Sequence, residues 1–401
     1  MNKFLKVRQG KIVQGTRQPV VLKGINLGGW LMMEGYLLNG ANIPEKRFRE
    51  EFARRLGKKA LEDFDESFRN AFVREEDICT IARWGFNCIR VPFHYRVVES
   101  APFQYQGSGL RFLDKVIGWA KKHKIWVILD LHAAVGSQNK DWHADSSGEA
   151  LFWARKSYQE RMLSLWEFLA DRYQDTEAIA GYDLLNETVL DDPGPLNRFY
   201  KALIGRLRAI DRNHILFVEG NTWATDLACL EEFSDDNYAL SIHSYEPPAV
   251  TFNFVPHLRY PSPDRKDAAY SKALLRRHLN PYARLARERG LAVLVGEFGV
   301  NYRQGHGGEE RWVKDMLECF REYGFHWTYW TYKAVKNSVY PDGIFSYYEN
   351  PPWVRREGPV CGWETYPSCW SKMKKEMIHS WHTKAFEVNT HILKTLRHGA
   401  R

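Results

Sequence analysis

Cysteine is scarce in this sequence, with six residues in a chain of 401. No two of them have the CxxC spacing, and this absence argues against a structural zinc site. Cys361 and Cys369 share one predicted loop and could pair, although the reducing compartment that the N-terminus suggests disfavours a disulfide. The other four lie in apolar helix or strand patterns and are expected to be small buried hydrophobes: Cys79, Cys88, Cys229 and Cys319.

Long hydrophobic runs are also missing. No apolar segment approaches the roughly 20 residues of a membrane span, so we expect no membrane partner. The first eight residues contain no apolar stretch of signal-peptide length. We therefore expect a cytoplasmic protein, or a secreted one if a signal was removed before the numbering begins. A hydrophobic content of 44% with 26% charged residues excludes a disordered chain, collagen or a coiled coil.

No signature of a nucleic-acid-binding fold accompanies the net charge of +8. The basic residues are spread along the chain and mixed with 49 acidic ones, which indicates a mildly basic surface and no nucleic-acid partner. Aromatic residues are abundant at 14%, and 15 of them are tryptophan. Such rings fill cores, but they also offer flat faces on which a ligand can stack.

Short apolar segments alternate with amphipathic helical patterns along the chain. These segments are nearly continuously apolar, as expected of strands that are buried on both faces. Eight such segments predict one (β/α)8 barrel domain over residues 1–401. An open doubly wound sheet is the alternative, but Gly28-Gly29-Trp30 after the first strand does not form the glycine-rich GxGxxG loop of that fold. The predicted strands are residues 20–27, 87–93, 126–132, 180–187, 214–220, 238–245, 291–299 and 326–333.

The helices between these strands follow a period of three to four residues. In residues 112–124, for example, the apolar positions fall on one stripe. Ahead of the first strand, residues 5–9 and 12–14 flank a turn at Gly10-Lys11, which predicts a hairpin that closes the bottom of the barrel. The other predicted helices are residues 48–61, 161–172, 196–211, 270–289 and 310–323.

Polar residues end several of the apolar strands. Active groups of such barrels lie at the C-terminal ends of the strands, and two carboxylates, Glu187 and Glu297, end the fourth and seventh strands. Cleavage of an acetal needs one protonated and one ionised carboxyl group around the same bond. Arg90 and Tyr245 could hold Glu297 as the anion, whereas Glu187 has no cation in its own strand and is expected to have a higher pKa.

Seven motifs in order make the sequence similar to glycoside hydrolase family 5. They cover about residues 20 to 335, and the ordered set is far more specific than any one motif. The first segment most resembles the exo-glucanase and β-glucosidase members, whereas the continuation at residues 333–338 departs from the common cellulase form. The motifs are residues 24–30 (GINLGGW), 85–92 (GFNCIRVP), 130–132 (DLH), 185–187 (LNE), 242–245 (IHSY), 296–299 (GEFG) and 327–333.

The resemblance implies a role for each matching residue. Glu187 would be the acid/base and Glu297 the nucleophile, about 5–5.5 Å apart, as in retaining enzymes. It implies neither a metal nor a cofactor. His132, His243 and Asp130 could ligate a metal, but the spacing of a metal-binding motif is absent. The implied substrate-binding residues are Arg90, His132, Asn186, His243, Tyr245 and Trp330.

Aromatic loops leave further assignments open. Trp142, which we include among the candidate substrate-binding residues, His143 and Trp153 follow the third strand and either line sugar subsites or fasten their own loop. Trp30 is expected to pack, because the adjoining glycine pair indicates tight backbone. The long aromatic loop at residues 340–370 is expected to be a lid or a wall of the substrate cleft.

The sequence thus predicts a retaining β-glycosidase that acts on β-glucosides or short β-glucans. The predicted partner is a β-linked oligosaccharide or glycoside, and the oligomeric state stays open. An endo-acting cellulase or mannanase of the same family and a non-catalytic carbohydrate-binding barrel are the alternatives. A sugar-phosphate enzyme is disfavoured, because no glycine-rich phosphate cup follows the seventh or eighth strand.

Overall fold

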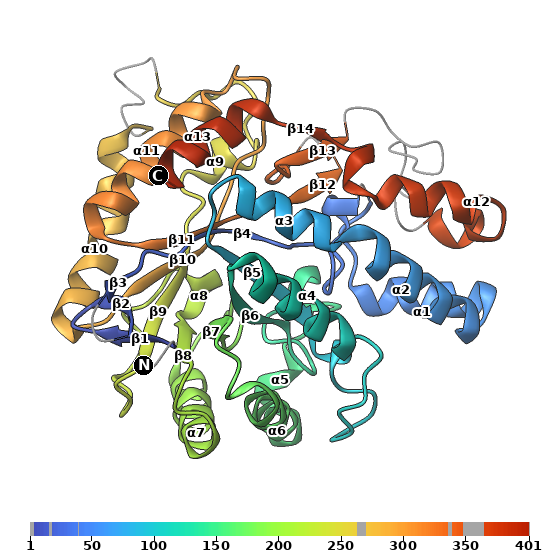
Figure 1. Cartoon of the computed structure of the whole chain (residues 1–401), viewed down its shortest axis with the longest axis horizontal. Coiled ribbons are helices and arrows are strands. Elements are labelled where there is room, and N and C mark those ends of the chain that lie inside the picture. Colours follow the sequence, from blue (N-terminus) through green and yellow to red (C-terminus); the bar gives the residue numbers. More distant parts are fainter. Residues whose placement is uncertain are drawn as a thin grey trace.

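Eight parallel strands form a closed barrel at the centre of the molecule (Figure 1). The computed structural model describes residues 4–15, 18–38, 40–262, 270–335, 339–347 and 365–400. Each barrel strand pairs with its neighbours in chain order, and the last pairs with the first, so the predicted (β/α)8 barrel is confirmed. The strands are β4 (Lys23–Asn26), β5 (Cys88–His94), β6 (Trp126–Ala133), β7 (Ile179–Asp183), β8 (Ile215–Glu219), β9 (Tyr238–His243), β10 (Val293–Phe298) and β11 (His326–Tyr329).

A ring of helices covers the barrel, because strands that are apolar on both faces need an outer layer. Helix α4 (Leu110–His123), for example, buries Phe112, Leu113 and Val116. The predicted helices after the second strand are present within a few residues of their expected bounds. The other helices of this ring are α3 (Glu75–Arg83), α6 (Lys156–Tyr173), α7 (Gly194–Ile210), α10 (Lys272–Arg289), α11 (Glu309–Tyr323) and α13 (Thr390–Ala400).

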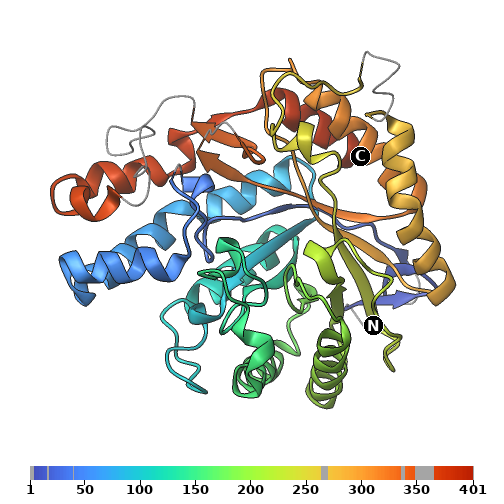
Figure 2. The same ribbon diagram turned by 180° about the vertical axis from the view of Figure 1, so that it is seen from behind.

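The first predicted helix, residues 48–61, is instead two helices. Gly57 has φ +89°, a conformation that side-chain-bearing residues rarely adopt, and it separates α1 (Glu45–Leu56) from α2 (Lys58–Phe72). Both pack with α12 (Tyr366–Trp381) at one side of the barrel, as both views show (Figures 1 and 2). The rings of Phe52, Phe64 and Trp370 are in mutual contact at their centre.

The N-terminal hairpin closes the end of the barrel where the strands begin. Strands β1 (Leu5–Arg8) and β2 (Lys11–Gln14) pair antiparallel, and β3 (Gln18–Pro19) adds a third strand. Leu5, Val7 and Ile12 pack in one buried cluster with barrel residues such as Ile128 and Phe217. The hairpin therefore fills this end with apolar side chains, as the sequence predicted, and leaves the opposite end for chemistry.

A second small sheet lies beyond the barrel strands. It joins β12 (Lys333–Val335), β13 (Phe345–Tyr347) and β14 (Glu387–Val388). Of the predicted loop at residues 340–370, residues 348–364 lie outside the described part of the chain, and α12 already begins at Tyr366. The proposed pairing of Cys361 with Cys369 also involves a residue outside that part.

No helix among the described residues is long and apolar enough to cross a membrane. Short helical segments are α5 (Leu151–Ala154), α8 (Asn221–Ala224) and α9 (Pro248–Thr251).

Candidate active site

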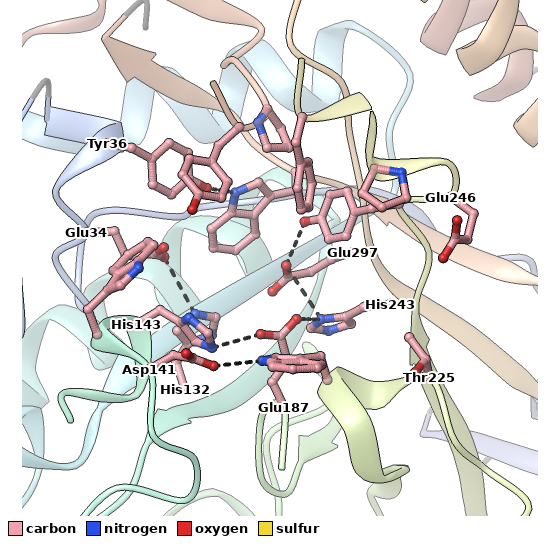
Figure 3. Close-up of a pocket in the computed structure, with 18 of the residues that line it drawn as sticks. Glu34, Tyr36, His132, Asp141, His143, Glu187, Thr225, His243, Glu246 and Glu297 are labelled. Atoms are coloured by element: carbon pink, nitrogen blue, oxygen red, sulfur yellow. Dashed lines mark hydrogen bonds and ion pairs between the residues drawn. The ribbon is translucent and has the colours of Figure 1, made fainter. Parts of the chain in front are cut away.

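A cavity of about 380 Å³ lies at the C-terminal ends of the barrel strands (Figure 3). This end is the one where the active sites of such barrels are built, and the volume is that of a small-ligand site. Seven of the predicted site residues line it: His132, Trp142, Glu187, His243, Tyr245, Glu297 and Trp330.

Glu297 is held by two donors at the end of β10. Nη1 of Arg90 donates to Oε1 of Glu297 over 2.8 Å, and the hydroxyl of Tyr245 donates to Oε2 over 2.7 Å. The side chain of Glu297 is 6% exposed and lines the cavity. A carboxyl group fixed in this way has the geometry of a nucleophile.

Arg90 does not line the cavity but binds Glu297, as the sequence predicted, and its direct contact with substrate stays a prediction. Its guanidinium is fully buried beneath the cavity and also contacts Asp130 at 3.1 Å, Asp183 at 2.8 Å and Glu219 at 3.2 Å. Burial and the neighbouring Glu219 carboxylate raise the pKa of Asp183 well above its usual range. The guanidinium of Arg90 opposes this shift, because it favours the ionised form of Asp183.

Glu187 has a left-handed backbone with φ +48°, and its N–H donates to Oε2 of Glu219 over 2.6 Å. Its carboxylate lies between two imidazoles (Figure 3): Nδ1 of His243 at 2.6 Å and Nε2 of His143 at 3.0 Å. Burial alone would raise the pKa of Glu187, but the two histidines outweigh it and hold that pKa well below its usual range.

The expected higher pKa of Glu187 is therefore wrong. The groups that lower the pKa of Glu187 are His243, on β9, and His143, in the loop after β6. Neither lies in the strand that precedes Glu187. Burial lowers the pKa of His243, but the carboxylates of Glu297, Glu219 and Glu187 raise it well above its usual range. The pKa of His143 is raised by Glu187 in the same way, against the effect of burial. The pKa of Glu187 and those of the two histidines are therefore shifted in opposite directions.

The two catalytic candidates lie close together. One oxygen of Glu187, one oxygen of Glu297 and a ring nitrogen of His243 all lie within 4.8 Å of one another. Retaining glycosidases have carboxyl groups about 5–5.5 Å apart, and inverting ones need about 6.5–9.5 Å to admit a water. The separation therefore fits direct attack by one carboxylate.

Among the described residues, two sets of donors have the spacing of a cation site. The first comprises Glu187, His243 and Glu297, and the second comprises Asp130, Asp183 and Glu219. In the second set the guanidinium of Arg90 already supplies the positive charge. In the first, imidazole, guanidinium and phenol donors satisfy both carboxylates. Protein groups alone therefore account for both arrangements.

Trp330 and His132 form another side of the cavity. The two rings stack with centroids 5.6 Å apart and 6° between their planes, and the indole N–H donates to the hydroxyl of Tyr36. Nδ1 of His132 lies 2.8 Å from Asp130, and Nε2 lies 3.6 Å from Glu34. Burial lowers the pKa of His132, but Asp130 and Glu34 outweigh it and raise that pKa to about 10.

Asn186 lies beneath the cavity beside Arg90. Its Oδ1 accepts from Nη2 of Arg90 over 2.9 Å, and its Nδ2 has no hydrogen-bond partner in the described part of the chain. This buried amide therefore has a donor to spare for a substrate hydroxyl. Its contact with substrate stays a prediction, as do the substrate contacts of the residues that line the cavity.

The aromatic loops divide between binding and packing. Trp142 and His143 line the cavity, whereas the indole N–H of Trp153 donates to the carbonyl of Gln138 and fastens the loop. Trp30 is 1% exposed and packs, as predicted. Tyr340 opens the predicted loop at residues 340–370 and lies on the cavity wall.

Several residues of the site were missed in the sequence. Glu219 ends the apolar run of β8, which is the same signal that identified Glu187 and Glu297. Tyr36 and Glu34 lie in the loop after β4, where no pattern marks them. Trp223 and His278 also line the cavity, from α8 and from α10, and neither position is at a strand end.

A closed (β/α)8 barrel with two facing carboxylates at this end defines a glycoside hydrolase. The family model for cellulase (glycosyl hydrolase family 5) matches residues 56–336. This chain belongs to glycosyl hydrolase family 5.

Curated relatives carry several different names. A β-xylosidase of Phanerodontia chrysosporium is 36% identical over 354 residues, covering 83% of this chain and 71% of that protein. Endoglucanase C of Acetivibrio thermocellus is 25% identical and covers 79% of this chain and 92% of the relative. A probable glucan 1,3-β-glucosidase A of Aspergillus clavatus is 24% identical, with coverages of 86% and 91%. These relatives share the family and differ in their named substrates.

Solved structures agree on the fold. The endoglucanase Cel5A of Thermotoga maritima superposes with a TM-score of 0.62 at 18% identity, covering 94% of this chain and 96% of that one. At this level of identity the likeness extends to the barrel alone.

Proposed function

We propose that this protein is a retaining β-glycosidase that hydrolyses β-glucosides or short β-glucans by double displacement. The observation that carries the proposal is the pair of carboxylates with oxygens within 4.8 Å. One is bound by Arg90 and Tyr245 as an anion, and the other lies between two imidazoles. The different surroundings of Glu297 and Glu187 divide the roles of nucleophile and acid/base between them.

In the first step, Glu297 attacks the anomeric carbon and the bond to the leaving oxygen breaks. The leaving oxygen takes a proton from the Glu187 carboxyl, which itself receives a proton from His143 or His243, both within hydrogen-bond distance. A covalent ester then joins the sugar to Glu297. In the second step Glu187 removes a proton from water, the water oxygen bonds to the anomeric carbon, and the Glu297 carboxylate is released. The proton on Glu187 then returns to the imidazole that supplied the first one.

The substrate class rests on the relatives. A glucan 1,3-β-glucosidase, a cellodextrinase and a β-xylosidase occur among them, and each name describes only that protein. Glucosides with a β linkage are the class that most of these names share. A β-xyloside is the second candidate, because the β-xylosidase has the higher identity of the three, at 36%.

A panel of substrates tests this proposal. Aryl β-glucosides, β-xylosides and β-mannosides are compared with β-1,3- and β-1,4-linked oligosaccharides, and the anomer formed first is identified by NMR. We expect β-glucosides to be cleaved with the β-anomer appearing first, and Glu297→Gln to abolish turnover. An α-anomer formed first, or near-normal activity of Glu297→Gln, contradicts the mechanism. Cleavage within long chains, without release of terminal units, favours the endo-acting alternative.

A further inference from the structure

A lysine is buried next to the strand end that carries Trp330. Lys333, the first residue of β12, is 1% exposed and follows Trp330 by three positions. It does not line the active-site cavity, and the proposed reaction gives it no part. Lysine is almost never fully buried unless its charge has partners, so the contacts of this ammonium group indicate what it does.

The ammonium group of Lys333 lies where two helices end. Its Nζ donates to the carbonyl of Phe72, the last residue of α2, and over 2.7 Å to the carbonyl of Trp381, the last residue of α12. A third hydrogen bond, of 3.0 Å, goes to the hydroxyl of Thr383. The last carbonyls of a helix lack partners within the helix and carry its partial negative charge, so both helix ends favour a cation here.

Two aromatic rings complete the surroundings of this group. Nζ of Lys333 lies 4.3 Å from the ring centroid of Phe72 and 5.0 Å from that of Phe386, which follows α12. A cation over the face of a ring is attracted to it. Hydrogen bonds and rings from both helical segments thus converge on one side chain of β12.

The charge of Lys333 is costly in this position. Burial, aided by Arg74 and opposed by Asp77 on α3, lowers the pKa of Lys333 to about 8. Asp77 also accepts a hydrogen bond of 2.9 Å from the hydroxyl of Tyr332. A buried cation adds little net stability, because its hydrogen bonds must first offset the loss of its hydration. We therefore expect Lys333 to act on the geometry of its neighbours more than on the stability of the fold.

The strand that carries Lys333 packs against a wall of the cavity. Ala334, the next residue, lies in one buried cluster with Tyr36, Leu37 and Trp330. Tyr36 and Trp330 line the cavity, and the indole N–H of Trp330 donates to the hydroxyl of Tyr36. A displacement of β12 therefore acts directly on these two rings.

The chain between Trp330 and Lys333 is short and has little freedom. The N–H of Tyr332 donates to the carbonyl of Asn26, at the end of β4, over 2.9 Å. The hydroxyl of Thr331 donates to the same carbonyl over 3.0 Å. Because both intervening residues are fastened to the barrel, the position of Lys333 is coupled to that of Trp330.

We propose that Lys333 is a positioning residue, whose ammonium group holds the ends of α2 and α12 against β12 and thereby fixes the cavity wall formed by Trp330 and Tyr36. This inference rests on the proposed function, in which the wall contacts the sugar, and adds that affinity for the sugar depends on a residue outside the cavity. A wall that binds the sugar equally in the ground state and in the transition state lowers KM without changing kcat.

The kinetics of Lys333→Met test the proposal. Methionine keeps an unbranched side chain of similar length, but it cannot donate to the three oxygens around Nζ. We expect KM for the best-cleaved aryl glycoside to rise about 10-fold, with kcat within about twofold of the wild type. Lys333→Arg keeps a cation with several donors and should recover part of the loss.

Lys23→Met is the matched control. Nζ of Lys23, at the start of β4, donates over 3.2 Å to the carbonyl of Ala400, the last residue of α13. This contact is also between a lysine and a helix end, but it lies at the end of the barrel opposite to the cavity. Lys23→Met should therefore keep the wild-type KM and kcat, whatever the change in its melting temperature.

Thr383→Val is a milder change in the same cluster. It removes one acceptor of Lys333 and leaves the two helix-end carbonyls in place, so KM should rise about two- to threefold. This variant decides the question if Lys333→Met does not fold. Hydrogen–deuterium exchange adds a measurement without substrate. Exchange should be faster than in the wild type in β12 and at the ends of α2 and α12 in both variants, and unchanged there in Lys23→Met.

Three outcomes overturn the inference. The first is an unchanged KM in Lys333→Met and Thr383→Val, and the second is a fall in kcat at unchanged KM. The third is an equal rise of KM in Lys23→Met, which means that a general loss of stability moves the wall. Failure of the proposed function is separate, because a wild-type enzyme without that function cleaves no glycoside of the panel. Hydrogen–deuterium exchange then still shows whether Lys333 holds the two helix ends.

Discussion

The backbone N–H of Glu187 donates a 2.6 Å hydrogen bond to Oε2 of Glu219. The other oxygen of Glu219 lies 3.2 Å from Nη2 of Arg90 and 3.2 Å from Nε2 of His243. Arg90 in turn binds Glu297. One buried carboxylate that does not line the cavity therefore connects the proposed acid/base to the proposed nucleophile.

Replacement of Glu219 should lower kcat and leave KM nearly unchanged. Glu219→Ala frees the backbone of Glu187 and removes an anion from Arg90, and a shift of about 1 Å in a catalytic group costs on the order of 100-fold in rate. Glu219→Gln keeps an oxygen that can accept from the Glu187 N–H and should lose less. For both variants, steady-state kinetics with an aryl glycoside measures kcat and KM, and thermal unfolding measures the stability. A Glu219→Ala enzyme with wild-type kcat contradicts this positioning role.

Removal of the acid/base should be rescued by an external nucleophile. Glu187→Ala leaves Glu297 free to form the ester with an activated aryl glycoside, but it lacks the base for the second step. Added azide needs no base, so we expect turnover to rise at least about tenfold and a β-glycosyl azide to form. NMR of the product identifies the anomer. An α-azide, or no rescue, contradicts the assignment of Glu187.

His143→Gln should raise the pKa of Glu187. The imidazole at 3.0 Å is one of two cations that favour the carboxylate, so its removal favours the protonated form and moves the pKa upward. Titration of ¹³C-labelled glutamate side chains by NMR measures the change, and Glu187→Gln assigns the resonance. A Glu187 pKa that is unchanged or lower in His143→Gln shows that His243 alone lowers the pKa of Glu187.

His132 should stabilise the fold at neutral pH and lose that effect in alkali. Its pKa is raised from 6.5 to about 10, so its contribution is complete below about pH 6.5 and disappears as the pH rises through 10. The difference in unfolding free energy between wild type and His132→Asn should therefore shrink by an amount on the order of a few kcal/mol over that range.

Chemical denaturation at several pH values measures the unfolding free energies of His132→Asn and the wild type. His398→Asn, at an exposed histidine of α13, serves as the control. If the difference in unfolding free energy between the wild type and His132→Asn is constant or grows with pH, the ion pair of His132 with Asp130 is contradicted.

The barrel could be predicted because each strand is a continuous apolar run that needs cover on both faces. The small sheet of β12, β13 and β14 could not, since its strands have two or three residues each and β13 pairs with β14 across more than 40 positions of sequence. Such short segments carry no period that separates them from loops.

The two candidate catalytic glutamates could be identified in the sequence, because burying a charge at the end of an apolar strand costs free energy and therefore indicates a function. The charge state of Glu187 was not visible, because it depends on the distances to His143 and His243 in other parts of the chain. Trp223 was hidden for another reason. Its left-handed turn contains no glycine or asparagine between positions 222 and 224, so no local signal marks it.

The N-terminal hairpin has a consequence for how the reaction cycle proceeds. Because side chains fill the barrel interior and Leu5, Val7 and Ile12 cover its far end, the freed sugar must leave through the same mouth by which the next substrate enters. Inhibition by this hydrolysis product should therefore be competitive.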